Sequence, residues 1–287
     1  MEVQDTHAKA KWAQSLGVSK SGYYAWLETR DERQERSSAR EEKVLTIFEQ
    51  GKGHYGAERI CGIIRSKGGQ ASFAVVKRIM DRHKLKSSHC RRRQRSLTDS
   101  RKARDERYKN LTRDLTVNRP FQVLSSDISY IRTGEGFDYL CQIRDVYSNT
   151  VLASLQQERM TKELVIKTMQ SVKQRWHIPE GTIFHADRGS QYTSKEVQQC
   201  AAQYGWQQSF SRVGKPGDNA WSESFFSVLK KEIIHWQFYP SRELARQKVF
   251  EYIEVYYNRQ RKQKRLGYLS PIEFLNKWSA KQLACAS

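Results

Sequence analysis

Three acidic residues of this 287-residue chain lie where a carboxylate needs an explanation. Asp127 is in the middle of a predicted strand, where aspartate is depleted and where burying a carboxylate is costly unless it is paired or metal-bound. Asp187 follows an apolar strand, at the end where open α/β sheets place their ligands, and Glu223 comes near the start of a predicted helix. Three such carboxylates could hold two Mg²⁺ ions, about 4 Å apart, that promote an in-line displacement at phosphorus.

Each carboxylate also has a simpler interpretation. Asp187 could be a turn-forming aspartate before Gly189, and Glu223 could belong to a solvated helix face. Only Asp127 favours a functional role by itself, so the hypothesis depends on the three residues taken together.

The predicted helix that carries Glu223 has two distinct faces. An apolar stripe, at the spacing that places residues on one side of a helix, consists of Trp221, Phe225, Val228 and Leu229. A polar face lies about 200° around the helix and consists of Glu223, Ser227, Lys230 and Lys231. The apolar stripe is expected to pack on a core.

The elements that would position these residues begin near residue 119. The segments "PFQVLSSDISYIRT" and "FDYLCQIRDVYSNTVLASLQ" alternate with period two and predict three consecutive antiparallel strands. A helix, the strand before Asp187, a helix opened by a capping box of Thr193 and Glu196, the strand "WQQSFS" and helices from Asn219 and Ser241 follow. This order is typical of a ribonuclease-H-like α/β domain, by fold analogy.

The first 114 residues read as helical and basic. Residues 1–35 contain what looks like the tail of a helix-turn-helix. Two apolar-periodic segments on either side of "KGGQAS" predict either a second helix-turn-helix or an ordinary helical hairpin. Residues 82–104 then hold ten Lys or Arg against one acid, and they include Arg91, Arg92, Arg93 and Arg95. This run is either a solvated linker or, as we favour beside helix-turn-helix signals, one that follows DNA phosphates.

Composition narrows the class of partner. The net charge of +20 and the pI of about 9.8 favour a polyphosphate such as nucleic acid. No apolar run approaches the roughly 18 residues of a spanning helix, so no membrane partner is expected. Five scattered cysteines without a CxxC pair predict neither a zinc site nor a disulfide framework, and they favour a reducing, cytoplasmic location.

The sequence also resembles a known family. Thirty-five residues separate Asp187 from Glu223, a spacing like that of the retroviral integrase and DDE-transposase superfamily. The words "SSDISYI", "FHADRGSQYTS", "SRVGKPGDNAWSESFFSVLKKE" and "YYNRQRKQKRLGYLSPIEF" are similar to the second reading-frame product of the bacterial insertion-sequence-three family. The resemblance extends from about Leu16 to Trp278.

The resemblance implies roles for particular residues. Asp127, Asp187 and Glu223 would be the metal-binding catalytic triad, and Lys230 would approach the transposon-end DNA. Lys231 would be a further phosphate contact or merely solvated. Support of the site or contact with DNA would come from Arg188, Gln191, Tyr192 and Asn219. Ala186 and Gln263 depart from the Ser and His common in the family, which leaves any role of that His in doubt.

The resemblance also implies an activity and partners. The chain would be a DDE transposase that uses two Mg²⁺ or Mn²⁺ ions for 3′-end cleavage and strand transfer, through a circular intermediate, at the nucleoid of a bacterial cytoplasm. It would bind terminal inverted repeats and target DNA and act as a dimer or higher oligomer on DNA, with the upstream reading-frame product as a candidate further partner. The alternatives are a nuclease of the same fold and a non-catalytic DNA-binding protein.

The expected architecture is an α/β ribonuclease-H-like core preceded by small all-α domains. Its predicted parts are a partial helix-turn-helix segment (1–35), a helical DNA-binding domain (36–90), a basic linker (91–114), the catalytic core (115–240) and a C-terminal helical extension (241–287).

Overall fold

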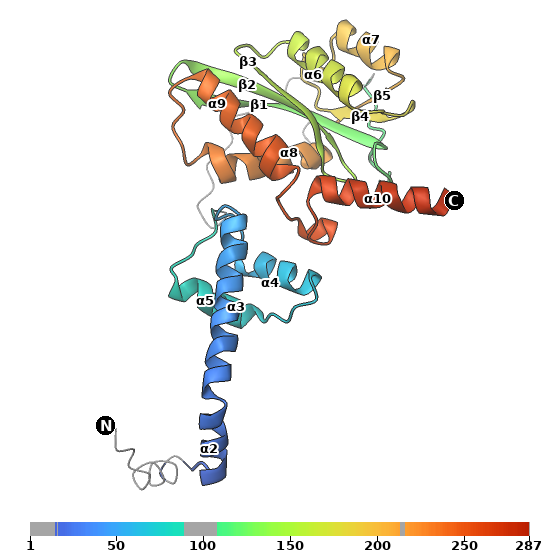
Figure 1. Ribbon diagram of the computed structural model, residues 1–287. Helices are drawn as coiled ribbons and strands as arrows, with labels where there is room; N and C mark the ends of the chain where they lie inside the picture. The colour runs from blue at the N-terminus through green and yellow to red at the C-terminus, as the bar shows by residue number, and fades with distance from the viewer. Residues whose placement is uncertain (1–14, 16, 89–107, 213–215, 287) are drawn as a thin grey trace.

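The computed structural model describes residues 15, 17–88, 108–212 and 216–286. Its N-terminal part contains a short helix α2 (Lys20–Glu28), a long helix α3 (Arg30–Gln50) and the pair α4 (Ala57–Ser66) and α5 (Phe73–Arg82). The helices α2 and the first half of α3 project away from the rest, whereas α4 and α5 pack beside the second half of α3 (Figure 1). The two helices predicted around the double glycine are confirmed, and Gly68 takes a positive φ of 78° in the turn between them.

The first predicted domain boundary is not where the helices divide. One continuous helix, α3, runs through residues 35 and 36. Its first half is exposed and polar, and it carries ion pairs one turn apart such as Glu32 with Arg36 at 3.0 Å. A helix without an apolar stripe gives no periodic signal, so the continuity of α3 across residues 35 and 36 was not apparent in the sequence.

A mixed five-stranded sheet forms the larger part of the molecule. Its strands are β1 (Val123–Thr133), β2 (Gly136–Asp145), β3 (Val151–Gln157), β4 (Ile183–Ala186) and β5 (Gln207–Phe210), in the spatial order β3-β2-β1-β4-β5. The first three are antiparallel, and β4 and β5 run parallel to β1. The predicted element order and the ribonuclease-H-like fold are confirmed.

Helices cover both faces of this sheet (Figure 1). The helices α6 (Lys162–Arg175) and α7 (Lys195–Gln203) bury one core with the sheet. The helices α8 (Ala220–Leu229) and α9 (Arg242–Phe250), with a π-helical segment (Glu251–Tyr257), bury a second core on the opposite face. β1 serves both cores, since Leu124 points into the first and Ile131 into the second.

The predicted C-terminal extension is therefore part of the core. Ala245, Val249 and Ile253 are fully buried in the cluster that contains Ile131 of β1 and Leu140 of β2. The last helix, α10 (Pro271–Ala286), runs to the C-terminal end beside this body (Figure 1). Within the described ranges, no helix has the length and apolarity needed to cross a membrane.

The N-cap of α7 is one residue later than the capping box predicted from Thr193 and Glu196. Ser194, rather than Thr193, is the N-cap, and its hydroxyl accepts a hydrogen bond from the backbone N–H of Val197 at 3.4 Å. Thr193 instead donates to the carbonyl of Gly189 at 3.3 Å. Two adjacent hydroxyl residues made the start of the helix ambiguous in the sequence.

The N-terminal helices are joined to the core by buried contacts. Tyr256 donates a hydrogen bond to the carbonyl of Gly51 at 2.9 Å, and the backbone N–H of Lys262 donates to the Tyr55 hydroxyl at 2.8 Å. Gly62 of α4 lies directly against Tyr268, where an added Cβ would come within 1.8 Å of the ring. A side chain at residue 62 would push the two parts apart.

A buried ion pair lies beside this joint. Arg261 and Glu232 are almost fully buried, and the guanidinium Nη2 and Nε donate to the carboxylate at 2.8 to 3.1 Å. Tyr252 donates a further hydrogen bond to Glu232 at 2.7 Å. Glu232 belongs to the π-helical segment Lys230–Ile234 that continues α8, so the pair fixes the end of the helix that carries Glu223.

We expect Arg261→Met to destabilise the chain by about 3–5 kcal/mol, because Glu232 would stay buried without its partner. The double variant Glu232→Leu/Arg261→Met should recover much of this loss, since it buries no charge. Urea unfolding followed by tryptophan fluorescence measures both. The exposed Arg36→Met is the control, and a cost for Arg261→Met as small as that of the control would contradict the role of the buried pair.

Candidate active site

The pairing of β1 with β4 brings two of the three carboxylates together. The two strands are parallel, and the register matches Val123 with Ile183 and Ser125 with His185. Asp127 lies two residues beyond Ser125, and Asp187 lies two residues beyond His185. Matched residues on neighbouring strands point to the same face about 4.8 Å apart, so this register places Asp127 beside Asp187.

The third carboxylate approaches from the helix on that same face. Asp127 is paired across β1 and β2 with Gln142, and residues directly opposite each other share a face. Gln142 donates a hydrogen bond to the hydroxyl of Ser222 on α8 at 3.3 Å. Glu223 is the next residue of α8 and is exposed to solvent. The face of Asp127 is therefore the one that α8 covers.

The charges of Asp187 and Glu223 both act on Asp127. Burial and the charges of Asp187 and Glu223 together raise the pKa of Asp127 to about 7, whereas the Ile128 N–H and the charge of Lys230 lower it. Burial also raises the pKa of Asp187, whose carboxylate accepts a hydrogen bond from the Gly189 N–H at 3.0 Å. The site holds more negative charge than its surroundings neutralise.

This surplus charge suits a hard cation. All three groups are carboxylates, the ligands that Mg²⁺ and Mn²⁺ prefer, and a positive ion would offset the repulsion that disfavours ionised Asp127. Across the part of the chain that the structure describes, no group of three or more His, Cys, Asp or Glu side chains is placed so that it could hold a metal ion. Ions at this site would keep positions for water and for phosphate oxygens.

Lys230 lies at the edge of the site. Its ammonium group is 5.2 Å from the centre of the Tyr130 ring, and the negative charge of Asp127 acts on it. Burial lowers the pKa of Lys230 below its ordinary value. The regular turns of α8 end here, since the π-helical segment begins at Lys230, a feature frequent at functional sites. Lys231 is half-buried beside it.

A polar network that the sequence did not reveal fixes Asp218 in the segment just before α8. The Asp218 carboxylate accepts hydrogen bonds from Arg212 Nε and from Asn110 Nδ2, both at 2.9 Å, and Arg212 holds the pKa of that carboxyl well below its usual range. His185 Nε2 lies 3.0 Å from the Asp218 carbonyl and 3.1 Å from the Ser211 hydroxyl. These residues are far apart in the sequence, and only the fold unites them.

Two residues expected at the DNA surface are buried instead. Tyr192 is 1% exposed, and its hydroxyl lies 2.8 Å from that of Ser126, on the face of β1 opposite Asp127. A DNA contact by Tyr192 is therefore wrong for this structure. Asn219 is 6% exposed and is the N-cap residue of α8, although its side chain makes no capping hydrogen bond.

Arg188 and Gln191 secure the loop after β4. Arg188 donates to the carbonyls of Ser211 at 2.8 Å and Tyr108 at 3.1 Å, and Gln191 donates to the carbonyl of Met160 at 3.2 Å. These contacts fit the supporting role that was one of the two expected. Arg91, Arg92, Arg93 and Arg95 lie outside the described residues.

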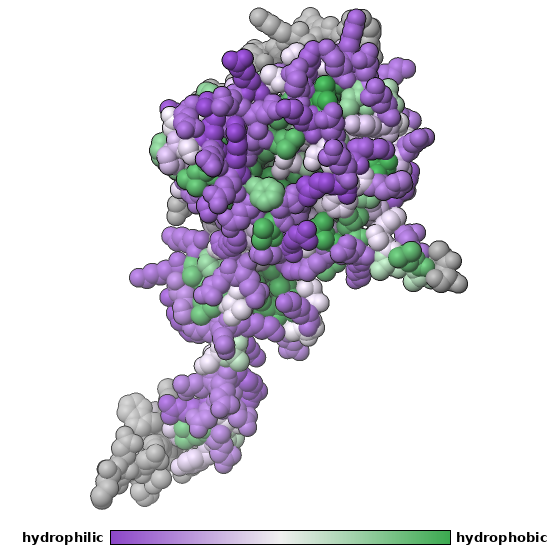
Figure 2. Space-filling model, turned by 45° about the horizontal axis from the view of Figure 1, so that its top comes forward, coloured by the Kyte–Doolittle hydropathy of each residue, from purple (hydrophilic) through white to green (hydrophobic). Residues whose placement is uncertain are grey.

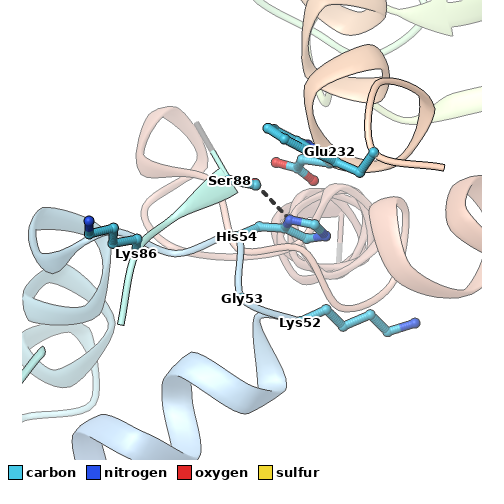
Figure 3. Close-up of a pocket in the computed structure, with 7 residues that line it drawn as sticks. Lys52, Gly53, His54, Lys86, Ser88 and Glu232 are labelled. Carbon is cyan, nitrogen blue, oxygen red and sulfur yellow. Dashed lines mark hydrogen bonds between the residues drawn. The ribbon is translucent and has the colours of Figure 1, made fainter. Parts of the chain in front are cut away.

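A separate cavity of about 350 Å³ lies where the N-terminal helices meet the core (Figure 3). It is lined by Lys52, His54 and Lys86 from the helical part and by Glu232 and Trp236 from the segment after α8. His54 Nδ1 is hydrogen-bonded to the Ser88 hydroxyl at 2.8 Å. None of the three catalytic candidates lines this cavity, which belongs to the joint between the two parts.

Comparison with protein families defines the class. Residues 117–216 and 223–278 match two models that are each described as an integrase core domain, and residues 35–94 match an HTH-like domain. The chain thus combines an integrase core with an N-terminal HTH-like domain.

Comparison with individual proteins defines the family. The chain is 34% identical over 271 residues to the transposase InsF for insertion sequence IS3A of Escherichia coli (strain K12), covering 91% of this chain and 92% of that one. It is 34% identical over 268 residues to an insertion element IS600 uncharacterized 31 kDa protein of Shigella sonnei, covering 92% and 97%. It is 35% identical over 234 residues to the transposase for IS904 of Lactococcus lactis, covering 81% and 92%.

The chain therefore belongs to the IS3 family of transposases. A solved simian T-cell lymphotropic virus intasome, in complex with the PP2A regulatory subunit B56 gamma, aligns with a TM-score of 0.42 at 14% identity, over 56% of this chain and 57% of that one.

We expect Asp127→Asn to raise the unfolding temperature of the metal-free chain at pH 8 and to change it little at pH 4. The carboxyl ionises at its usual 3.8 in the unfolded chain but at about 7 in the folded one. Because the folded chain binds the Asp127 proton more tightly than the unfolded chain does, protonation stabilises the fold fully below pH 4. This stabilisation is lost as the pH rises through 7.

The gain at pH 8 is on the order of a few kcal/mol, at about 1.4 kcal/mol for each pH unit between the two values. Thermal melting in EDTA measures it, with the exposed Asp114→Asn as the control. Equal effects of Asp127→Asn at both pH values would contradict the buried, repelled carboxylate.

Proposed function

We propose that this chain is a DDE transposase that cleaves the 3′ ends of an insertion sequence and transfers them to new phosphodiester positions, using two Mg²⁺ or Mn²⁺ ions. The observation that carries the proposal is the convergence of Asp127, Asp187 and Glu223 on one face of β1, with a raised pKa for Asp127. Membership of the IS3 family supports it.

The chain's own groups have distinct tasks in this proposal. Asp127, Asp187 and Glu223 would hold the ions, which when bound would activate the attacking oxygen and stabilise the leaving one at phosphorus. Lys230 would bind a phosphate of the DNA end beside the site. Asp218 and His185 would fix the start of α8, so that Glu223 keeps its position while DNA enters.

The DNA would be held by both parts of the chain. The helices α4 and α5 would recognise the terminal inverted repeats, and the basic surface would bind phosphates without regard to sequence. Hydrophilic side chains dominate the visible face of the molecule (Figure 2), and the chain as a whole has a net charge of +20. Lys52 and Lys86 add positive charge at the joint between the parts.

The reaction would follow the copy-out, paste-in course. One cleaved 3′-OH would attack the flanking DNA beside the other end of the same element, and the joined product would mature to a circle that integrates elsewhere. Pairing two ends requires at least a dimer on DNA, with the upstream reading-frame product as a possible further partner. The work would take place at the nucleoid in the cytoplasm.

We expect the chain with Mg²⁺ to join labelled end duplexes into branched or bridged strands on a denaturing gel. Glu223→Gln should bind the same duplexes with an affinity within about twofold and yield no joined strands, because the ions would lose a ligand. Mn²⁺ should replace Mg²⁺, and EDTA should abolish both cleavage and joining.

The two alternatives have different outcomes in the same assay. A nuclease of the same fold would give cleaved strands and no joined ones. A non-catalytic DNA-binding protein would leave the DNA unchanged in wild type and variant alike, with the upstream product supplied as well. Ser227→Ala, on the exposed face of α8 one turn after Glu223, is the matched control and should join strands normally.

A further inference from the structure

An exposed aromatic pair lies on the hairpin of β1 and β2, beyond the catalytic carboxylates. Tyr130 is 36% exposed and Phe137 is 47% exposed, although both sit within strands. Their ring centres are 5.2 Å apart in an edge-to-face arrangement. Arg132 is directly opposite Phe137 in the register and is exposed as well. Two aromatic rings and a guanidinium thus share one open face of the hairpin.

This surface borders the candidate active site but lies on the other face of β1, because Tyr130 is an odd number of residues from Asp127 in a regular β1–β2 register. β4 pairs only with residues 123–125 of β1, so the carboxylates lie where that pairing stops and the hairpin continues past them. Lys230 connects the two regions, because its ammonium group interacts with Asp127 and lies 5.2 Å from the centre of the Tyr130 ring. Tyr130 is three residues from Asp127, about 10 Å along the strand.

The charge around Tyr130 and Phe137 indicates which class of partner could bind there. Aromatic rings beside Arg132 and Lys230, on a chain with a net charge of +20, suit a polyanion that also offers flat apolar faces. Nucleic acid bases have such faces only when they are not stacked inside a duplex. A second copy of this chain would bring like charge to the same place, which disfavours it as the occupant.

We propose that Tyr130 and Phe137 form a stacking platform for unpaired bases of the DNA strand held in the active site. A DNA strand with a phosphate at Asp127 would reach the platform within a few nucleotides by passing over the edge of β1 that β4 leaves unpaired. The position of the platform rests on the proposed function, because it places the scissile phosphate at the carboxylates. Stacking would keep a few nucleotides beside that phosphate out of the duplex.

The test compares single-stranded with duplex binding by the full chain. Fluorescence anisotropy is measured in EDTA, with a labelled oligo-dT and with a labelled 30-bp duplex, for wild type and variants. Tyr130→Ala/Phe137→Ala should lower the affinity for oligo-dT roughly tenfold or more and the affinity for the duplex less than twofold. Phe250→Ala removes a phenylalanine on α9 that is 61% exposed; it is the control and should change neither affinity.

Conservative variants separate stacking from other roles of Tyr130. Tyr130→Phe should bind oligo-dT as wild type does, because stacking needs the ring and not the hydroxyl. Tyr130→Leu, of similar bulk but without a ring, should bind oligo-dT as weakly as Tyr130→Ala. Equal losses for both DNA forms, or no loss for either, would overturn the platform, as would Tyr130→Leu that binds like wild type.

A covalent probe locates the contact directly. An end duplex that carries 5-iodo-deoxyuridine within three nucleotides of the cleavage position should photocross-link to Tyr130 or Phe137 in the Glu223→Gln background. Cross-links confined to other residues would overturn the proposal. Neither DNA binding nor cross-linking requires the enzyme to cleave or join DNA. The stacking platform can therefore be supported in a chain that does not join strands, and it can be refuted in a chain that does.

Discussion

The candidate active site depends on the parallel pairing of β1 with β4. This register holds Asp127 and Asp187 side by side, although their charges repel and their surroundings disfavour ionisation. The packing of the sheet offsets the free-energy cost of this repulsion, because the sheet is buried on both faces. One core lies under α6 and α7 and another under α8 and α9. A destabilising charge cluster thus lies on the central strand of the sheet, where a divalent cation would relieve the repulsion.

The third carboxylate depends on a different set of constraints. α8 is held at its start by Asp218 and His185, and after its end by the buried pair of Glu232 and Arg261. The same C-terminal segment also contacts the N-terminal helical part, through hydrogen bonds from Tyr256 and Lys262. The helix that carries Glu223 is therefore linked by direct contacts to the part that matches an HTH-like domain.

The sequence predicted the order of strands and helices because each has a strong period and clear turn residues. It also identified Asp127, since a carboxylate inside a strand is unusual. It could not predict that Tyr192 lies in the core. This tyrosine is in a loop, where no periodic pattern of apolar residues indicates whether a ring points inward or outward. The network of Asn110, His185 and Asp218 arises from contacts between distant segments, which no local pattern encodes.

The most direct test of the site is to map where a metal ion contacts the chain. Fe²⁺ in place of Mg²⁺, with ascorbate and peroxide, cuts the backbone near bound metal, and mass spectrometry locates the cuts. The account predicts cuts near Asp127, Asp187 and Glu223 that all disappear in Asp187→Asn. Cuts at only one of these positions, or cuts at all three that persist in Asp187→Asn, would contradict a single metal site built by the three carboxylates.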